Sequence, residues 1–547
     1  MKKMLYLIAL LLALPVGAQK KLSASEWQQD LRFLQTTVHN EYPFLFKKTT
    51  AEAFDAEVEK LYKAIPSMER HEIIVGLARI VSMFQYGHTA LGILRSPAEF
   101  HQLPVNVYQF SDGVYIQGVH KDYKKALGAK IIAIEGMPVE KAMQAIYPVT
   151  FAENDQFFKA YGLRYLGVPE VLHARGVMKS LKNTVTFTLE RNGKQFKQEI
   201  TAMKELQPPA RYGFIQQEGD WLDARNEGEE PLYLKNLDKL YYFQYLPEAK
   251  TVYVRQSQVQ DDPAEDIPAF YQRVFEFVEK NDVERLIIDV RLNGGGNNYK
   301  NKPVIRGIVG SGKIDQPGKL FVILGRRTFS ACQNLVNEMS NYTNAIFVGE
   351  PTAENINFYG DNRQVELPNS KLPAYLSYAW WQDKPQWENA PWLAPHVAVE
   401  MSFEDYRTNK DPVLEAALNF KDAQFVLDPM AHLTGLFMAG KYEEVKREAR
   451  KLVEDPRYRF ADFEDQFNRA GYRLMQQNQL KEALFVFELN TGLYPNSANA
   501  WDSLGEVYMK SGNKAKAIEY YQKALRMDPD GPTGKNAREM LKKIQAD

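Results

Sequence analysis

The chain has 547 residues, of which 45% are apolar and 25% charged, and its 68 Lys and Arg against 69 Asp and Glu give a net charge of −1. At about 100–200 residues per domain, this length predicts several domains. The composition excludes wholesale disorder, a collagen-like fold and a multi-span membrane protein. Charges are scattered without long runs of one sign, so nothing indicates nucleic-acid binding. The single cysteine, Cys332, excludes an intramolecular disulfide.

Residues 1–18 differ from the rest of the chain. Lys2 and Lys3 precede an apolar run over residues 4–14, and small residues lie at Val16 and Ala18. This pattern predicts a secretory signal cleaved after Ala18, and therefore an exported protein that is periplasmic or secreted. The apolar run is shorter than the roughly 20 residues of a spanning helix, so we expect no stable membrane span after signal removal; an uncleaved anchor is the alternative.

The next segments predict a helical unit followed by a β-rich unit. Apolar spacings of three and four predict a helical cap over residues 19–99. Alternating apolar residues then predict strands in residues 100–205, at 105–108, 113–116, 130–134 and 184–189. Residues 125–136 resemble the helix-to-strand passage of a PDZ domain, but the carboxylate-binding loop of that module is not recognisable. Scaffolding and peptide capture therefore both remain open for this unit.

Residues 206–240 contain Pro208-Pro209 and many polar residues, which indicates a connecting segment or a peripheral hairpin. In residues 241–426, strands and helices alternate, which predicts an α/β core with its sites at strand ends. The expected strands are 251–254, 285–290, 319–324 and 345–348, and the expected helices are 267–279 and 331–339.

Residues 427–547 are helical again and contain an internal repeat of 34 positions. Its second copy has Trp501, Leu504, Gly505, Tyr508, Ala517, Tyr521, Ala524 and Pro529, and the first has Phe467, Ala470, Gly471, Leu474, Ala483, Phe487, Asn490 and Pro495. These spacings resemble the tetratricopeptide repeat. A looser pair over residues 431–452 predicts a third unit. Such repeats imply a protein partner, although a packing extension of the core is the alternative.

Two stretches of the predicted core could carry chemistry. Residues 289–296 read DVRLNGGG, so an apolar strand runs into glycines whose N–H groups can face a ligand. Residues 328–331 read TFSA, and they place the Ser330 hydroxyl at the start of a helix, where backbone donors favour developing negative charge. Each stretch alone has an ordinary structural explanation, a tight turn for the glycines and a helix cap for the serine.

Together with Gly87-His88-Thr89, with Val348 to Thr352 and with the β-rich insert, these stretches resemble the tail-specific, or C-terminal processing, serine peptidases. The resemblance covers residues 27–418. It implies a ClpP/crotonase-type α/β core that acts on unfolded or C-terminal protein segments without a cofactor. It also implies a nucleophile at Ser330 and an oxyanion hole formed by Gly295, Gly296 and Ala331.

The same resemblance guides the choice of catalytic base. The Ser-Lys branch places a lysine about 25 residues after the serine, but residues 353–357 read AENIN and hold none. The branch similar to the tricorn core and to interphotoreceptor retinoid-binding protein uses a histidine oriented by a glutamate, which implies His88 and Glu388 here. An imidazole of near-neutral pKa can take the serine proton while a carboxylate fixes its tautomer.

Two positions depart from that branch: Tyr86 replaces an aspartate before Gly-His, and His396 replaces an aspartate after Pro395. They leave open a second reading, a catalytically inactive peptidase fold that binds a ligand or partner. Cys332 is expected to point away from Ser330, because two helical steps turn the side chain by about 200°. The eight histidines are dispersed without metal-ligand spacing, so no metal site is predicted.

Overall fold

The computed structural model describes residues 21–203, 206, 208–387, 390–420 and 425–546. The signal predicted for residues 1–18 lies outside them. None of the helices in this part of the chain combines the length and apolarity that crossing a membrane requires.

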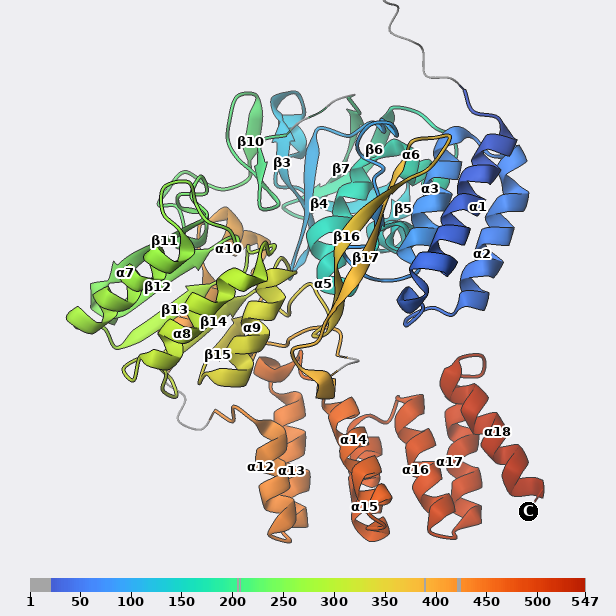
Figure 1. Ribbon diagram of the computed structural model, residues 1–547, viewed down its shortest axis with the longest axis vertical. Helices are drawn as coiled ribbons and strands as arrows, with labels where there is room; N and C mark the ends of the chain where they lie inside the picture. Colours follow the sequence, from blue (N-terminus) through green and yellow to red (C-terminus); the bar gives the residue numbers. More distant parts are fainter. Residues whose placement is uncertain (1–20, 204–205, 207, 388–389, 421–424, 547) are drawn as a thin grey trace, which may run out of the picture.

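Three helices form the N-terminal cap, along one flank of the molecule (Figure 1). They are α1 (Ala24–Glu41), α2 (Ala51–Ala64) and α3 (Arg70–Ser82). Helix α1 begins with a reciprocal capping box between Ser23 and Glu26, which satisfies N–H groups at the helix start. The apolar faces of the three helices pack into a core cluster shared with the β-rich unit, so the two units are not separate hydrophobic bodies.

The β-rich unit is a seven-stranded sheet in which β10, β3, β4, β6 and β7 are neighbours in that order, while β2 pairs with β3 and β5 with β4. Strand β10 lies in the segment expected to be a connection or a peripheral hairpin. Helices α4 (Val139–Ile146), α5 (Asp155–Phe157) and α6 (Pro169–Ala174) lie in the chain between β5 and β6. The strands are β2 (Val105–Phe110), β3 (Gly113–His120), β4 (Lys130–Ile134), β5 (Met137–Pro138), β6 (Thr184–Arg191), β7 (Lys194–Thr201) and β10 (Trp221–Asp223).

The α/β core is a six-stranded sheet with the order β11-β12-β13-β14-β15-β18, parallel except for the β11–β12 pair. Helices α7, α8 and α9 pack on one face and α11 on the other. Strands β12, β14 and β15 are buried along their whole length, as parallel strands covered on both faces must be. Its elements are β11 (Tyr241–Leu246), β12 (Thr251–Gln256), α7 (Ile267–Lys280), β13 (Arg285–Asp289), α8 (Lys302–Gly310), β14 (Leu320–Leu324), α9 (Ala331–Tyr342), β15 (Ile346–Gly349), β18 (Val397–Ala398), α10 (Phe403–Arg407) and α11 (Pro412–Leu418).

A long hairpin joins the core to the cap. Its strands β16 (Phe358–Glu366) and β17 (Pro373–Trp381) rise from the core in Figure 1, and β17 pairs with the short cap strand β1 (Ala90–Leu91). Next to this pairing, the buried hydroxyls of Thr89 and Ser377 lie 2.7 Å apart. The end of the cap is thereby held against the core one residue after His88.

The C-terminal helices stack in antiparallel pairs below the core (Figure 1). The repeat glycines allow close packing, since a Cβ at Gly471 would lie 2.6 Å from the ring of Phe487. An ion pair of 2.9 Å between Arg459 and Glu400 joins the repeats to the core. The helices are α12 (Pro429–Met438), α13 (Tyr442–Glu454), α14 (Phe463–Gln476), α15 (Leu480–Leu493), α16 (Ala498–Lys510), α17 (Lys514–Met527) and α18 (Pro532–Ala546).

Candidate active site

Ser330 lies between β14 and α9, on a turn that the backbone makes under strain. Its φ is +58° and its ψ is −129°, a region that residues with a Cβ rarely adopt. The turn is held by the N–H of Phe329, which donates to the carbonyl of Asn293 at 3.1 Å. A strained turn from a strand into a helix presents a side chain at the sheet edge, where a nucleophile is accessible.

The glycine loop after β13 packs directly against this turn. A Cβ at Gly295, whose φ is +95°, would lie 2.6 Å from the Cβ of Ser330 and 2.9 Å from the nitrogen of Ala331. The N–H of Gly295 donates to the side chain of Asn293 at 2.9 Å, so it is already engaged. The N–H groups of Gly296 and Ala331 have no acceptor among the described residues, and that of Ala331 is the first of its helix. Gly295 therefore provides close approach, and Gly296 and Ala331 are the better candidates for oxyanion donors.

His88 reaches Ser330 from the cap, 242 residues earlier in the chain. Its Nε2 lies 3.0 Å from the Ser330 Oγ. The imidazole is stacked between the rings of Phe329 and Phe358, with centroid distances of 4.6 and 6.1 Å. A Cβ at Gly87 would collide with Phe329 at 2.7 Å, so only glycine allows this approach. The structure thus brings together the serine and histidine that the sequence selects.

The carboxylate beside His88 belongs to Glu354, in the loop between β15 and β16. Its Oε1 lies 3.1 Å from the His88 Nδ1, and its Oε2 accepts the backbone N–H of Ser330. The Nδ1 and Oε1 atoms are at hydrogen-bond distance but are not aligned, and neither has another hydrogen-bond partner among the described residues. Glu388, which the resemblance implies for this position, lies outside the described residues.

Residues 353–357 hold no lysine, but they hold Glu354, which was not predicted from the sequence as a site residue. A signal was present, because this acid follows Ser330 by 24 residues, close to the position where the Ser-Lys branch carries its base. A carboxylate in a loop after a core strand could have been weighed as the partner of His88.

A second buried acid, Glu153, lies in the same cluster. It accepts the N–H of Gly87 at 2.7 Å and that of Asn355 at 3.0 Å. Burial and the neighbouring Glu354 raise the pKa of Glu153 to about 7, opposed by Lys48. Burial also raises the pKa of Glu354 and lowers that of the His88 imidazole. The cluster is therefore a desolvated group of titratable side chains, as catalytic sites commonly are.

The two departures from the resemblance lie in packed surroundings. Tyr86 is buried, with its ring edge-on to Tyr359 at 5.2 Å and the Lys48 ammonium 4.9 Å from its centroid. The Nδ1 of His396 accepts the N–H of Phe347 at 2.9 Å, and burial lowers its pKa to about 4, which fits a neutral structural histidine. Cys332 is buried, and burial raises its pKa well above the ordinary value.

A cavity of about 300 Å³ lies between the β-rich unit and the segment that leads to Ser330. It is lined by Tyr108, Tyr161, Arg164, Arg326 and Arg327, among other residues. Tyr161 also contacts Phe329, the residue before the serine, with a centroid distance of 6.1 Å. Tyr161 thus links the lining of the cavity to the residue that precedes the nucleophile.

Comparisons with known proteins identify the fold. Mature CPAF matches with a TM-score of 0.50 and 14% identity, over 74% of this chain and 99% of that chain. A mutant of CPAF matches with a TM-score of 0.52 and 13% identity, over the same shares of the two chains. The photosystem II D1 C-terminal processing protease has 15% identity over 73% and 98% of the two chains, with a TM-score of 0.33. At these identities the likeness is one of fold, and the two CPAF structures support at that level the architecture that the sequence predicts.

The repeats match independently. The family model described as tetratricopeptide repeat matches residues 498–530. The tetratricopeptide repeat domain-containing protein PYG7, chloroplastic, of Arabidopsis thaliana is 26% identical over 81 residues, which are 15% of this chain and 27% of that protein. The chain thus matches only about a quarter of that relative's length. The predicted architecture, a mixed α/β fold followed by helical repeats, is confirmed.

Proposed function

We propose that this protein is an exported serine endopeptidase in which Ser330 is the nucleophile, His88 the general base and Glu354 the orienting carboxylate. The observation that carries the proposal is the 3.0 Å contact between the Ser330 Oγ and the His88 Nε2, with Glu354 3.1 Å from the other ring nitrogen. Serine, histidine and acid in this relation activate a hydroxyl on several unrelated folds.

The proposed reaction is peptide hydrolysis through an acyl-enzyme. As the Ser330 Oγ attacks the peptide carbonyl, the His88 Nε2 takes the hydroxyl proton, and Glu354 stabilises the imidazolium that forms. The N–H groups of Ala331 and Gly296 stabilise the oxyanion of the tetrahedral intermediate. His88 then gives the proton to the leaving amine, and a water deprotonated by His88 releases the acyl group from Ser330.

The substrate class is an extended, unfolded or C-terminal peptide segment. The strained serine turn at the edge of the sheet and the neighbouring cavity of about 300 Å³ support access by such a chain. The tetratricopeptide repeats would bind a protein partner or client. Export is proposed on the pattern of residues 1–18 alone.

A fluorophosphonate probe tests the proposal, because it reacts with activated serines. We expect the purified protein to be labelled, Ser330→Ala to abolish labelling, and His88→Gln to slow it by about 100-fold or more. Cys332→Ala is the matched control, two residues from the nucleophile, and should label as the wild type does. Folded wild type that stays unlabelled would support the alternative of an inactive binding protein. Labelling that survives Ser330→Ala would show that another residue is the reactive nucleophile.

A further inference from the structure

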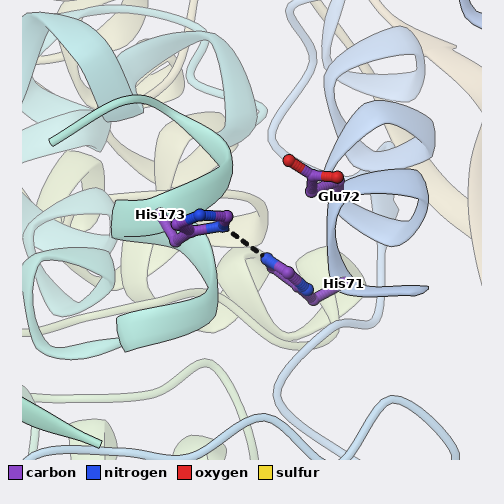
Figure 2. Close-up of side chains that lie close together, drawn as sticks. All are labelled: His71, Glu72 and His173. Atoms are coloured by element: carbon purple, nitrogen blue, oxygen red, sulfur yellow. Dashed lines mark hydrogen bonds between the residues drawn. The ribbon is translucent and has the colours of Figure 1, made fainter. Parts of the chain in front are cut away.

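A second cluster of chemically capable side chains lies away from Ser330, between the cap and the helices of the β-rich unit. His71 comes from the first turn of α3 and His173 from the last turn of α6, 102 residues apart. Figure 2 shows the two rings pointing at each other, with the His71 Nε2 2.8 Å from the His173 Nδ1. The sequence predicts no metal site because such a distant pair has no recognisable spacing.

Glu72 completes a set of three potential ligands. It follows His71 on α3, and its carboxylate lies beside the two rings in Figure 2. One ligand atom from each of the three residues lies within 4.8 Å of the others. Bonds of about 2.0–2.2 Å from Zn²⁺ to nitrogen and oxygen place tetrahedral ligands roughly 3.3–3.5 Å apart. Small side-chain rotations would therefore bring all three onto one ion.

The surroundings hold these side chains in place. The Glu72 Oε2 accepts the backbone N–H of Glu69 at 2.8 Å, so the helix start fixes one carboxylate oxygen and the other is available. The Nδ1 of His71 lies 3.5 Å from the Oε2 of Glu69. A carboxylate at the far nitrogen is the usual support of a metal-binding histidine, because it directs the lone pair of the other nitrogen to the ion.

Burial adds to this arrangement. The His71 side chain is 7% exposed, whereas His173 and Glu72 are partly exposed. An ion and one water can therefore reach the three side chains from solvent. In the absence of metal, one ring can donate an N–H to the other across the 2.8 Å contact, so the metal-free fold keeps the two facing nitrogens hydrogen-bonded.

We propose that His71, Glu72 and His173 form a binding site for a divalent transition metal, with Zn²⁺ as the best-fitting ion and water as its fourth ligand. Two imidazoles and a carboxylate are ligands that Zn²⁺ accepts in tetrahedral geometry. The ion would fasten α3 to α6. Since α3 leads through residues 83–87 to His88, this clamp would stabilise the cap segment that carries the proposed base.

The test is titration of the chelator-treated, full-length protein with Zn²⁺ against a chromophoric zinc chelator. We expect one tight equivalent and a zinc-dependent rise in melting temperature, because a ligand of the native state stabilises it. His173→Gln should weaken binding by about 100-fold or more, and Glu72→Gln by about 10-fold or more. Glutamine at position 72 can keep the capping box, so this variant separates lost ligation from lost folding.

Two matched controls locate the ion. His432→Gln removes an exposed histidine of α12 and should change nothing. His88→Gln tests the other cluster of potential ligands, formed by His88, Glu153 and Glu354, and should leave the tight equivalent intact. The proposal is overturned if the folded wild type takes up no zinc equivalent. It is equally overturned if folded His173→Gln and Glu72→Gln bind as the wild type does, or if His88→Gln abolishes the binding.

Discussion

The carboxylate of Glu153 accepts the backbone N–H of Gly87 at 2.7 Å, and this contact fixes the peptide unit next to His88. The same carboxylate accepts the N–H of Asn355, next to Glu354. One buried acid between α4 and α5 thus joins the two segments that supply the proposed base and its orienting carboxylate. Glu153 is a positioning residue, since its hydrogen bonds in the described part of the chain go to Gly87 and Asn355 and not to Ser330.

The raised pKa of Glu153 predicts a pH-dependent stability. A carboxyl whose pKa rises from 4.5 to about 7 on folding favours the folded state fully below pH 4.5, and this contribution is lost as the pH rises through 7. At 1.36 kcal/mol for each pKa unit, the loss amounts to about 3 kcal/mol. Urea unfolding of the wild type and Glu153→Gln at pH 4.5 to 8 should show this difference in their pH profiles. Parallel profiles would contradict the assignment.

Substitution of Gly295 should abolish activity while that of its neighbour should not. In Gly295→Ala the new Cβ would collide with Ser330 and Ala331, and the φ of +95° is unfavourable for alanine. We expect a loss of about 100-fold or more in labelling rate and destabilisation of about 1–3 kcal/mol. Gly294→Ala is the control, because its Cβ would meet only the Tyr161 hydroxyl at 3.6 Å. Equal rates for both variants would show that the glycine loop does not shape the site.

The orienting carboxylate can be identified by comparing two glutamates. Glu354→Gln should lower kcat/KM by about 10²–10⁴-fold, because an amide no longer stabilises the imidazolium and can favour the wrong tautomer. Glu388→Gln should stay within a few-fold of the wild type. Rates of probe labelling and of peptide hydrolysis measure both variants. The reverse ranking would assign the role to Glu388, as the family resemblance implies.

The pH dependence of labelling reports the protonation of His88. Because the base must be neutral and burial lowers the His88 pKa below 6.5, the rate should remain high at pH 6.5 and fall only at lower pH. An acid limb centred above pH 6.5 in the wild type would contradict the prediction. The residual labelling of His88→Gln should show no such limb.

The repetitive and periodic parts of the fold could be predicted from the sequence. The core strands β12, β13, β14 and β15, the helices α7 and α9 and the repeat helices follow from apolar periodicity, whereas β11 and β18 were not predicted. The repeat register follows from positions such as Gly505 and Tyr521. The addition of β10 to the β-rich sheet was missed, because three residues among polar neighbours give no periodic signal. Its pairing with β3 depends on contacts that only the folded chain provides.

The residues of the candidate site also divide into those that the sequence predicts and those that only the folded chain brings together. Ser330 and His88 lie in short motifs that resemble those of a known family, and the structure brings the two side chains together. No local pattern marks Glu354, Glu153 or the pair of His71 and His173. Their contacts form only when loops and helix ends separated by tens to hundreds of residues pack together. The engagement of the Gly295 N–H by Asn293 is likewise a matter of local geometry, which spacing does not encode.

Because 242 residues separate His88 from Ser330, the ribosome adds them to the chain at different times. During synthesis the histidine is made long before the serine, and the acid at position 354 is made later still. An incomplete chain therefore carries the histidine without the serine, and a complete but unfolded chain holds the two apart, so neither has the proposed activated nucleophile. Hydrolysis would begin only when the cap docks on the core, so the onset of probe labelling during refolding would time that docking event.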